Sequence, residues 1–340
     1  MKNRLVVPGN DGPPVRVSDL HRKVRKAVFP VGGLGTRFLP ITKAVPREML
    51  PIVDRPLIQY AVDEALAAGI SELIFVTHRS KRAIEDYFDR AVEFERALEG
   101  KGQHGQLAEL RGLAPDHMHI VYARQSAPLG LGHAIHCARH LIGNEPFAVI
   151  LPADLIDSDP PVLSQLLERY QTCGGSLVAV QSVRPEEASH FGFLQTDTTA
   201  PLARVEGIGE KPPAATPFAQ AVVGRYIFSP RVLDCLDCPP SGTNDEVQLT
   251  DAIDRLLALE PVFACQVRGT RYDCGSKLGF LDATLAYASR HAELGPAFRA
   301  KVTALARQWH VPRRSPRENA TDLPSSQAAS AASHLTLVSR

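Results

Sequence analysis

Short apolar runs alternate with longer amphipathic stretches along most of the chain. The first run, residues 27–31 (AVFPV), is uniformly apolar, as expected of a strand buried on both faces. Similar strands are predicted at 72–77, 118–122, 146–151, 176–182, 219–228 and 261–267. Helices are predicted between and after them, at 57–68, 80–98, 130–141, 160–172, 248–259 and 276–291. This alternation predicts an α/β fold with a mainly parallel (mixed) open sheet and helices on both faces.

The two ends of the chain lack this periodicity. Residues 1–25 are rich in Pro, Gly, Arg and Lys, and residues 312–340 are rich in Ser, Ala and Arg. Segments of this kind bury too little apolar surface to order themselves. We therefore expect a mobile arm at 1–25, one domain at 26–311 and a disordered tail at 312–340. The basic cluster HRKVRK at 21–26 is interpreted as a solvated lead-in to the first strand rather than a nucleic-acid contact.

Composition narrows the possible classes of function. The chain has 340 residues, 44% hydrophobic and 22% charged, which is typical of a globular protein with a large core. Its net charge of +1 gives no general attraction to nucleic acid or to membranes, so neither is expected as a partner. No apolar run is long enough to cross a bilayer and no secretory signal is recognisable. A cytoplasmic location is expected.

Cysteine and histidine patterns favour no structural metal site. The six cysteines are scattered, and Cys235 and Cys238 form a single CxxC, whereas a zinc ribbon needs two such pairs. His133, His136 and His140 fall in one predicted helix without the glutamate of an HExxH motif. Hydrogen-bonded or solvated histidines are the favoured interpretation.

A glycine-rich loop with several cations follows the first predicted strand. Glycine lets the backbone approach a ligand closely, and backbone N–H groups together with guanidinium or ammonium groups bind phosphate. A dinucleotide fingerprint would need glycine where Phe38 stands, and the GK[ST] of a P-loop is absent. In open α/β sheets the ligand lies beyond the carboxyl ends of the strands. We therefore predict a polyphosphate site there, formed by residues Gly32, Gly33, Gly35, Thr36, Arg37, Lys43 and Arg47.

Taken together, the motifs resemble those of the sugar nucleotidyltransferases, and among them the bacterial UTP:glucose-1-phosphate uridylyltransferases. GGLGTR at 32–37, TK at 42–43 and PREMLP at 46–51 are similar to the family's AGLGTR, TK and PKEMLP. Further strings occur in the family's order: VTHRSKRAIEDYFD at 76–89, RQSAPLGLGHAI at 124–135, GEKPP at 209–213, VVGRYIFSP at 222–230, EVQLTDAI at 246–253 and YDCGSKLGF at 272–280. The resemblance implies a Rossmann-like nucleotidyltransferase fold similar to glycosyltransferase A.

The resemblance also implies a reaction. Uridylyl is transferred from UTP to glucose 1-phosphate by in-line attack on the α-phosphorus, giving UDP-glucose and pyrophosphate. Because the attacking phosphate oxygen is already ionised, alignment and positive charge matter more than acid–base chemistry. The implied cofactor is Mg²⁺, the implied partners are UTP and glucose 1-phosphate, and the implied assembly is a homo-oligomer, either dimer or tetramer.

Each expected site residue is carried over from a matching motif position. The catalytic residues are Arg37, Arg47 and Lys211. Nucleotide contacts are expected from Gly33, Leu34, Gly35, Thr36, Gln125 and Gly130, with the Gln125 amide able to pair with both a carbonyl and a ring N–H of uracil. Sugar contacts are expected from Asp154, Gly192, Glu210 and Lys211. The metal is assigned to Asp273, with Asp154 as a second candidate.

Two positions depart from the family's pattern. Ala153 stands where the family has a metal-binding aspartate, and Arg47 stands where it has lysine. Alanine offers no oxygen to a hard cation, and a planar guanidinium does not replace a compact ammonium conservatively. A second hypothesis is therefore a weak or inactive relative that binds UDP-glucose or partners an active subunit. A third keeps the enzyme but changes the substrate to dTTP or another hexose phosphate.

Overall fold

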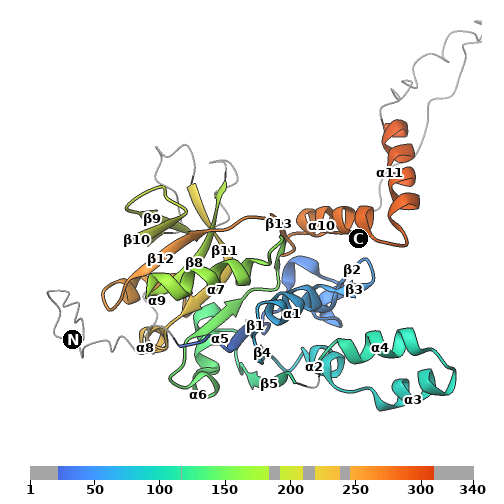
Figure 1. Ribbon diagram of the computed structural model, residues 1–340, viewed down its shortest axis with the longest axis horizontal. Coiled ribbons are helices and arrows are strands. Elements are labelled where there is room, and N and C mark those ends of the chain that lie inside the picture. Colours follow the sequence, from blue (N-terminus) through green and yellow to red (C-terminus); the bar gives the residue numbers. More distant parts are fainter. Residues whose placement is uncertain (1–21, 116, 184–191, 210–218, 238–245, 310–340) are drawn as a thin grey trace, which may run out of the picture. The chain divides into compact units, whose positions relative to one another are not determined.

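The computed structural model of the chain describes residues 22–115, 117–183, 192–209, 219–237 and 246–309 (Figure 1). Its contacts divide the chain into two units, Met1–Ala288 and Ser289–Arg340. This boundary falls inside the predicted domain 26–311. Almost all of the predicted arm and the whole predicted tail lie outside the described residues.

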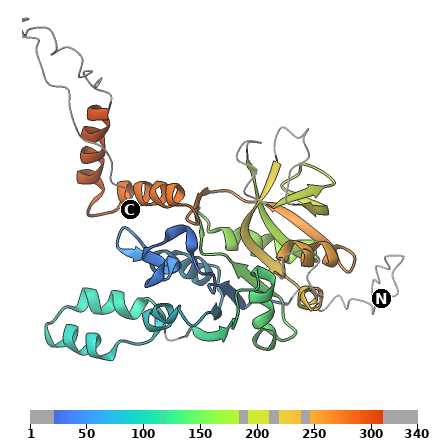
Figure 2. The same cartoon turned by 180° about the vertical axis from the view of Figure 1, so that it is seen from behind.

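The first unit is built on a nine-stranded mixed sheet with the order β5-β4-β1-β6-β11-β8-β12-β10-β9 (Figures 1 and 2). Four neighbouring strands, β5, β4, β1 and β6, are parallel. β11 runs antiparallel to both β6 and β8, and β10 runs antiparallel to β12 and β9, while β12 and β8 are parallel. The expectation of a mainly parallel sheet therefore holds only for the first half. Its strands are β1 (Lys26–Pro30), β4 (Glu72–Thr77), β5 (His119–Arg124), β6 (Phe147–Ile150), β8 (Ser176–Val183), β9 (Phe193–Thr196), β10 (Leu202–Gly209), β11 (Ala219–Phe228) and β12 (Val262–Gln266).

Both faces of this sheet are buried, which explains the uninterrupted apolar runs. In β1, Ala27 and Phe29 belong to one hydrophobic cluster and Val28 to the other. The same alternation divides the residues of β4, β6 and β8 between the two clusters. Because successive side chains point to opposite faces, a strand that is covered on both sides must be apolar throughout.

Helices cover both faces, as the sequence predicts. The first face packs against α1 (Leu57–Ala67), α2 (Arg82–Phe88) and α7 (Val162–Cys173). The second packs against α5 (Leu131–Cys137), α6 (Arg139–Ile142), α8 (Arg231–Leu236) and α9 (Leu249–Leu257). Among the described residues, no helix is long and apolar enough to cross a membrane.

Two predicted helices are broken in the structure. The stretch 80–98 divides into α2 and α3 (Val92–Gly100), because Asp89 adopts an extended conformation after α2. The stretch 130–141 divides at Ala138, whose N–H turns to the carbonyl of Ile135 at 3.0 Å. A further helix, α4 (His104–Gly112), lies beside α3 and was not predicted (Figure 1).

Two small antiparallel ladders and a long helix complete the first unit. β7 (Asp154–Asp157) pairs with β13 (Thr270–Asp273), and β2 (Pro51–Ile52) pairs with β3 (Arg55–Pro56). Helix α10 (Lys277–Arg290) begins four residues after β13, and its exposed side chains include Leu278 and Leu281. The second unit contains α11 (Gly295–Trp309).

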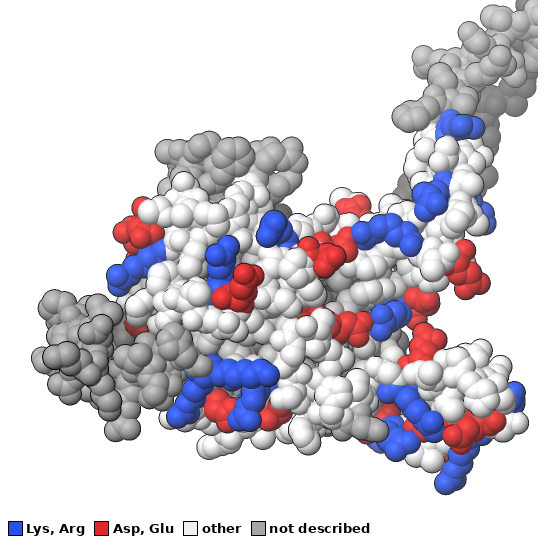
Figure 3. Space-filling view, viewed as in Figure 1, with Lys and Arg blue, Asp and Glu red and all other residues white. Residues whose placement is uncertain are grey.

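Positive and negative side chains are interspersed over the face seen in Figure 3. Lys and Arg total 38 and Asp and Glu total 37, so neither sign dominates the chain as a whole. Several of these charges form ion pairs, such as Arg82 with Asp86 and Arg139 with Asp234. Any strongly cationic site is therefore local.

Candidate active site

The glycine loop leads from β1 into three short 3-10 helices, η1 (Thr36–Phe38), η2 (Ile41–Lys43) and η3 (Arg47–Met49). Gly35 has a φ of +65°, a left-handed conformation that glycine adopts without strain. A Cβ at Gly35 would also lie 3.3 Å from Cβ of Arg47. Gly33, Leu34 and the η1 residues Thr36 and Arg37 are exposed. The loop therefore presents its backbone and cations on an accessible edge of the sheet.

Two arginines and an aspartate from distant parts of the chain meet at Gly275. A Cβ at Gly275 would lie 2.9 Å from Oδ1 of Asp273 and 3.8 Å from Nη1 of both Arg37 and Arg47. The N–H of Gly275 donates to Oδ1 of Asp273 at 3.0 Å. Two guanidinium groups beside one carboxylate form a place where phosphate oxygens and a divalent cation can be held together.

Arg47 is held in place by a buried ion pair. Its Nη2 donates to Oε1 of Glu48 at 3.2 Å, and Nζ of Lys81 donates to Oε2 of the same carboxylate at 2.7 Å. The side chains of Glu48 and Lys81 are each only 2% exposed. Nε of Arg47 is buried and has no hydrogen-bond acceptor among the described residues.

Gln125 and Gly130 lie next to each other at the other end of the glycine loop. Nε2 of Gln125 donates to the carbonyl of Gly130 at 3.1 Å, and the glutamine is 4% exposed. A Cβ at Gly32 would lie 2.6 Å from Oε1 of Gln125, so only glycine leaves room for this amide. The two predicted base contacts are thus brought together at the loop that Gly33 and Gly35 continue.

A cavity of about 190 Å³ extends from Leu131, the residue after Gly130, to Asp154 and Arg271. Two of the predicted sugar contacts, Asp154 and Gly192, line it. Glu210 and Lys211 lie outside the described residues, so their predicted roles stay predictions. The remaining lining residues are Leu131, Leu151, Ile208, Val222, Gly224, Tyr226, Gln248, Leu249, Thr250, Ile253 and Arg271.

The Asp154 carboxylate is engaged by Arg271, whose Nε donates to Oδ1 at 2.7 Å and whose Nη2 contacts the same oxygen. Gly224, with a φ of +63°, lies against Oδ2, where no side chain would fit. The contact with Arg271 weighs against Asp154 as a second metal ligand, because Oδ1 already accepts from Arg271. An acceptor oxygen that lines a cavity suits a sugar hydroxyl instead.

Asp154 and Asp273 are direct partners across the β7–β13 ladder. The N–H of Cys274 donates to the carbonyl of Ala153 at 2.8 Å, which places the substituted position beside Asp273. Burial and the nearby Asp273 raise the pKa of Cys274 to about 12, so it stays a neutral thiol. Among the described residues, no group of three or more His, Cys, Asp or Glu could hold a metal. The residues fit a cation carried mainly by substrate phosphates, with Asp273 as the protein ligand.

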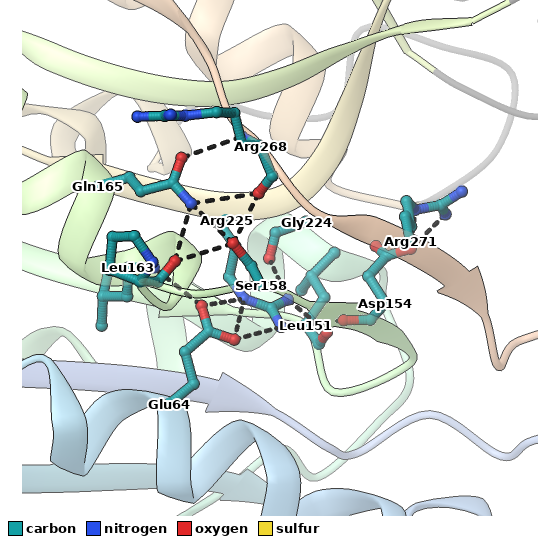
Figure 4. Close-up of polar contacts among 11 residues, drawn as sticks. Glu64, Leu151, Asp154, Ser158, Leu163, Gln165, Gly224, Arg225, Arg268 and Arg271 are labelled. Atoms are coloured by element: carbon teal, nitrogen blue, oxygen red, sulfur yellow. Dashed lines mark hydrogen bonds and ion pairs between the residues drawn. The ribbon is translucent and has the colours of Figure 1, made fainter. Parts of the chain in front are cut away.

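The segment that carries Asp154 is braced from below by a buried ion pair (Figure 4). The carboxylate of Glu64 on α1 accepts from Nε and Nη2 of Arg225, and Arg225 is 1% exposed. Nη1 of Arg225 donates to the carbonyl of Leu151 at 3.0 Å, and Nη2 donates to that of Asp154 at 2.9 Å. One arginine thus fixes both ends of the segment from Leu151 to Asp154.

Several of these positioning residues were not recognised from the sequence. A signal was present in some cases: Arg225 interrupts an apolar strand, and Gly224 beside it indicates close approach of another group. Glu48 lies within a quoted motif, but its burial against Lys81 could not be read from the sequence. Arg271 carried no local signal.

The sequence predicted that three histidines, His133, His136 and His140, lie in one helix, and the structure divides them between two. His133 and His136 lie on α5, but His140 lies on α6 beyond the break at Ala138. Nε2 of His136 lies 2.6 Å from Oδ1 of Asp237. Cys235 is buried, and its CxxC partner Cys238 lies outside the described residues.

Comparison with known proteins places this geometry in a family. The nucleotidyl transferase family pattern matches residues 26–290. A UTP–glucose-1-phosphate uridylyltransferase of Bacillus subtilis is 47% identical over 275 residues, covering 80% of this chain and 94% of that relative. A UTP-bound UGPase from Acinetobacter baumannii is 40% identical with a TM-score of 0.78, covering 83% of this chain and 100% of the other. A UDP-glucose pyrophosphorylase complexed with UDP-glucose is 42% identical with a TM-score of 0.71, covering 79% and 100%. The chain belongs to the nucleotidyl transferase family.

Proposed function

We propose that the chain is a UTP:glucose-1-phosphate uridylyltransferase, which makes UDP-glucose and releases pyrophosphate. The observation that carries this proposal is the meeting of Arg37, Arg47 and Asp273 at Gly275, in a site that also holds the Gln125 amide and the Asp154 cavity. These three parts provide for the phosphates, the base and the sugar of UDP-glucose. The names of the relatives, UTP–glucose-1-phosphate uridylyltransferase and UDP-glucose pyrophosphorylase, support the same activity.

The chain's own residues contribute alignment and charge to this reaction. Arg37 and Arg47 bind phosphate oxygens and stabilise the charge that develops during transfer. The Glu48–Lys81 pair keeps the Arg47 fork in one orientation, so little reorganisation is needed on binding. Asp154 and the backbone at Gly192 hold the sugar, which aligns the phosphate oxygen of glucose 1-phosphate for attack. Lys211 and Glu210 retain their proposed roles at the sugar phosphate.

Mg²⁺ is the proposed cofactor. Asp273 would hold it together with phosphate oxygens and water, since this ion commonly uses only one or two protein carboxylates. The ion supplies charge neutralisation on the transferring phosphoryl group. Asp154 is assigned to the sugar, because Arg271 already engages its carboxylate.

The two departures from the family motif do not favour an inactive relative. Arg47 keeps a positive charge beside Asp273. Ala153 removes one oxygen ligand, but Asp273 remains at the same end of the ladder. We therefore expect catalysis with weaker binding of the metal ion than an aspartate at position 153 would give. Preference for uracil over thymine, or for glucose over other hexoses, stays a prediction.

Self-association is also proposed. Leu278, Leu281 and Leu285 are 70%, 58% and 48% exposed and lie on one face of α10, at spacings of three and four residues. A row of exposed leucines on one helix is typical of a surface that another copy of the chain can cover. The cytoplasmic location stays a prediction.

The test is turnover by the purified full chain with UTP, glucose 1-phosphate and Mg²⁺. Pyrophosphate release and UDP-glucose formation should rise together in equal amounts. Asp273→Asn should lower the rate about a hundredfold, which corresponds to about 3 kcal/mol of lost transition-state stabilisation. Absence of both products at high enzyme concentration would overturn the proposal.

A further inference from the structure

Gln125 is held by hydrogen bonds that fix which way its amide points. Its backbone N–H donates to the carbonyl of Thr77 at 2.8 Å, and Nε2 lies 3.1 Å from the carbonyl oxygen of Gly130. Nε2 also lies 3.1 Å from Nδ1 of His133. A carbonyl oxygen can only accept a hydrogen bond, so the nitrogen of the amide must face Gly130.

The second N–H of that amide then belongs to His133. Nδ1 must accept from it, so Nδ1 is unprotonated and the proton of the neutral ring is on Nε2. Both donors of Gln125 are therefore used inside the protein. Only Oε1 remains, and it faces the glycine loop at Gly32. With this orientation the amide would meet the base through Oε1 alone, rather than through both of its groups.

An amide that offers only an acceptor distinguishes pyrimidines by their N3 atom. Uracil carries an N3–H donor, whereas cytosine has an unprotonated N3 acceptor. An oxygen facing N3 attracts uracil and repels cytosine, and a site built to hydrogen-bond one partner rejects its analogue strongly. The hydrogen bond from Gln125 to His133 thus bears on which base is accepted.

We propose that His133 is a positioning residue that, together with the Gly130 carbonyl, orients the Gln125 amide and so strengthens the preference for uracil over cytosine. This inference rests on the proposed function, because it assumes that the base lies against Gln125. His133 itself touches the amide and not the nucleotide.

The ring of His133 is placed so that this preference depends on pH. Burial, and to a lesser degree the charge of His136, lower the pKa of His133 from its usual 6.5. Sγ of Cys137 is 3.8 Å from Nε2, and burial raises the pKa of that thiol, so it stays neutral. Among the described residues no carboxylate pairs with His133, and Asp237, which follows α8, lies beside His136 instead.

If Nδ1 of His133 were protonated, its N–H would face the N–H of the Gln125 amide, and the two donors would repel each other. One of the two acceptors that hold the amide nitrogen would be lost while the Gly130 carbonyl keeps the other, so the amide would be held less firmly and its match to N3 of uracil would weaken. Selection of uracil is therefore greatest above the pKa of His133 and declines as the pH falls through it. Titration of the nucleotide phosphates affects both substrates equally and cancels in the UTP to CTP ratio.

The experiment compares kcat/KM for UTP and CTP, with glucose 1-phosphate saturating, between about pH 5.5 and about pH 8.5. In the wild type the UTP to CTP ratio should fall on the acid side. His133→Leu removes the acceptor and should lower the ratio about tenfold at neutral pH, mainly through KM. His133→Asn supplies an acceptor that does not titrate, so the ratio should stay high and flat at all pH values.

His136→Asn is the matched control, since His136 lies on the same helix and contacts Asp237. It should keep the wild-type ratio at neutral pH. Equilibrium binding of UTP and CTP, measured without glucose 1-phosphate, gives the same ratio even for a variant that does not turn over. An unchanged ratio in His133→Leu, or no pH dependence in the wild type, would overturn this inference while leaving the proposed function standing. A wild type that binds neither nucleotide would overturn both.

Discussion

At the scale of single residues, the site depends on side chains whose roles are set by their neighbours. Asp154 and Asp273 are partners in one ladder, yet Arg271 engages the first and the N–H of Gly275 engages the second. A sequence motif names both aspartates but not these partners. The motif suggests a sugar contact for Asp154 and a metal ligand for Asp273, and these partners add support to that proposed division.

Ala153 provides a test of the metal assignment. Ala153→Asp adds a carboxylate beside Asp273, because the carbonyl of Ala153 already bonds Cys274. The Mg²⁺ concentration for half-maximal activity should fall about tenfold, which corresponds to about 1.4 kcal/mol. Ala153→Asn has the same shape without the charge and should change it little. Equal effects of the two variants would contradict the assignment of this position.

Arg47 provides a test of phosphate binding. Arg47→Gln keeps much of the length of the side chain but removes its charge, and it should lower kcat/KM about a hundredfold, or about 3 kcal/mol. Arg47→Lys should recover part of that loss, because charge returns without the planar fork. Steady-state kinetics with varied UTP separates the effects on KM and kcat. A glutamine variant as active as the wild type would remove Arg47 from the site.

At the scale of elements, the sequence predicted seven of the nine strands of the buried sheet, because apolar periodicity is strongest there. It missed β9 and β10 at one edge of that sheet, and it also missed β7 and β13, which are short and carry Asp154, Arg271 and Asp273. Their pairing joins segments far apart in the sequence, and no local pattern records it. The elements that carry the chemistry were thus harder to predict than those that support them.

The buried ion pair between Glu64 on α1 and Arg225 on β11 gives a prediction in which stability and activity change independently. Glu64→Ala leaves Arg225 buried without its partner and should cost about 3–5 kcal/mol of unfolding free energy. Replacing both residues, Glu64→Leu with Arg225→Met, should restore much of the stability. Activity should stay low, because the carbonyls of Leu151 and Asp154 lose their donor.

Urea unfolding and turnover measure the two quantities for the Glu64 and Arg225 variants. Arg82→Ala, which breaks the exposed pair with Asp86, is the control and should change stability by at most about 0.5 kcal/mol. A double variant with full activity would show that the brace does not position Asp154.

The stability of the packing between α3 and α4 should depend on pH. Hydrogen bonds from Arg90 and Arg111 lower the pKa of Glu95 from 4.5 to about 2. A lowered pKa stabilises the folded state fully above pH 4.5, and this contribution declines as the pH falls toward 2. Hydrogen exchange in α3 and α4 should speed up over this window, and Glu95→Gln should remove that pH dependence. Equal pH profiles for the two proteins would contradict this role for Glu95.

At the scale of the whole molecule, the sequence predicted an α/β fold, and the structure agrees. It did not predict that β11 would run antiparallel to its neighbours in the middle of the sheet. A strand buried on both faces has the same uniformly apolar pattern whether it is parallel or antiparallel to its neighbours. It also placed the domain end at residue 311, whereas the contacts divide the chain after Ala288. The helical pattern of apolar residues continues across that boundary, so the sequence gave no indication that one unit ends there.

Self-association can be tested on the exposed face of α10. Leu281→Arg with Leu285→Arg should shift the protein toward the monomer in sedimentation velocity if another copy covers this face. Turnover per chain and the unfolding midpoint of the monomer should change little, because both side chains are exposed. An unchanged oligomer would exclude this face as the interface.

The most direct test of the central claim is a crystal structure of the protein with UDP-glucose and Mg²⁺. The account predicts N3 of uracil at Oε1 of Gln125 and the diphosphate between Arg37 and Arg47 near Gly275. It predicts the cation on Asp273. It predicts the glucose in the cavity lined by Asp154 and Gly192. A nucleotide bound away from the glycine loop, or a sugar outside that cavity, would contradict it.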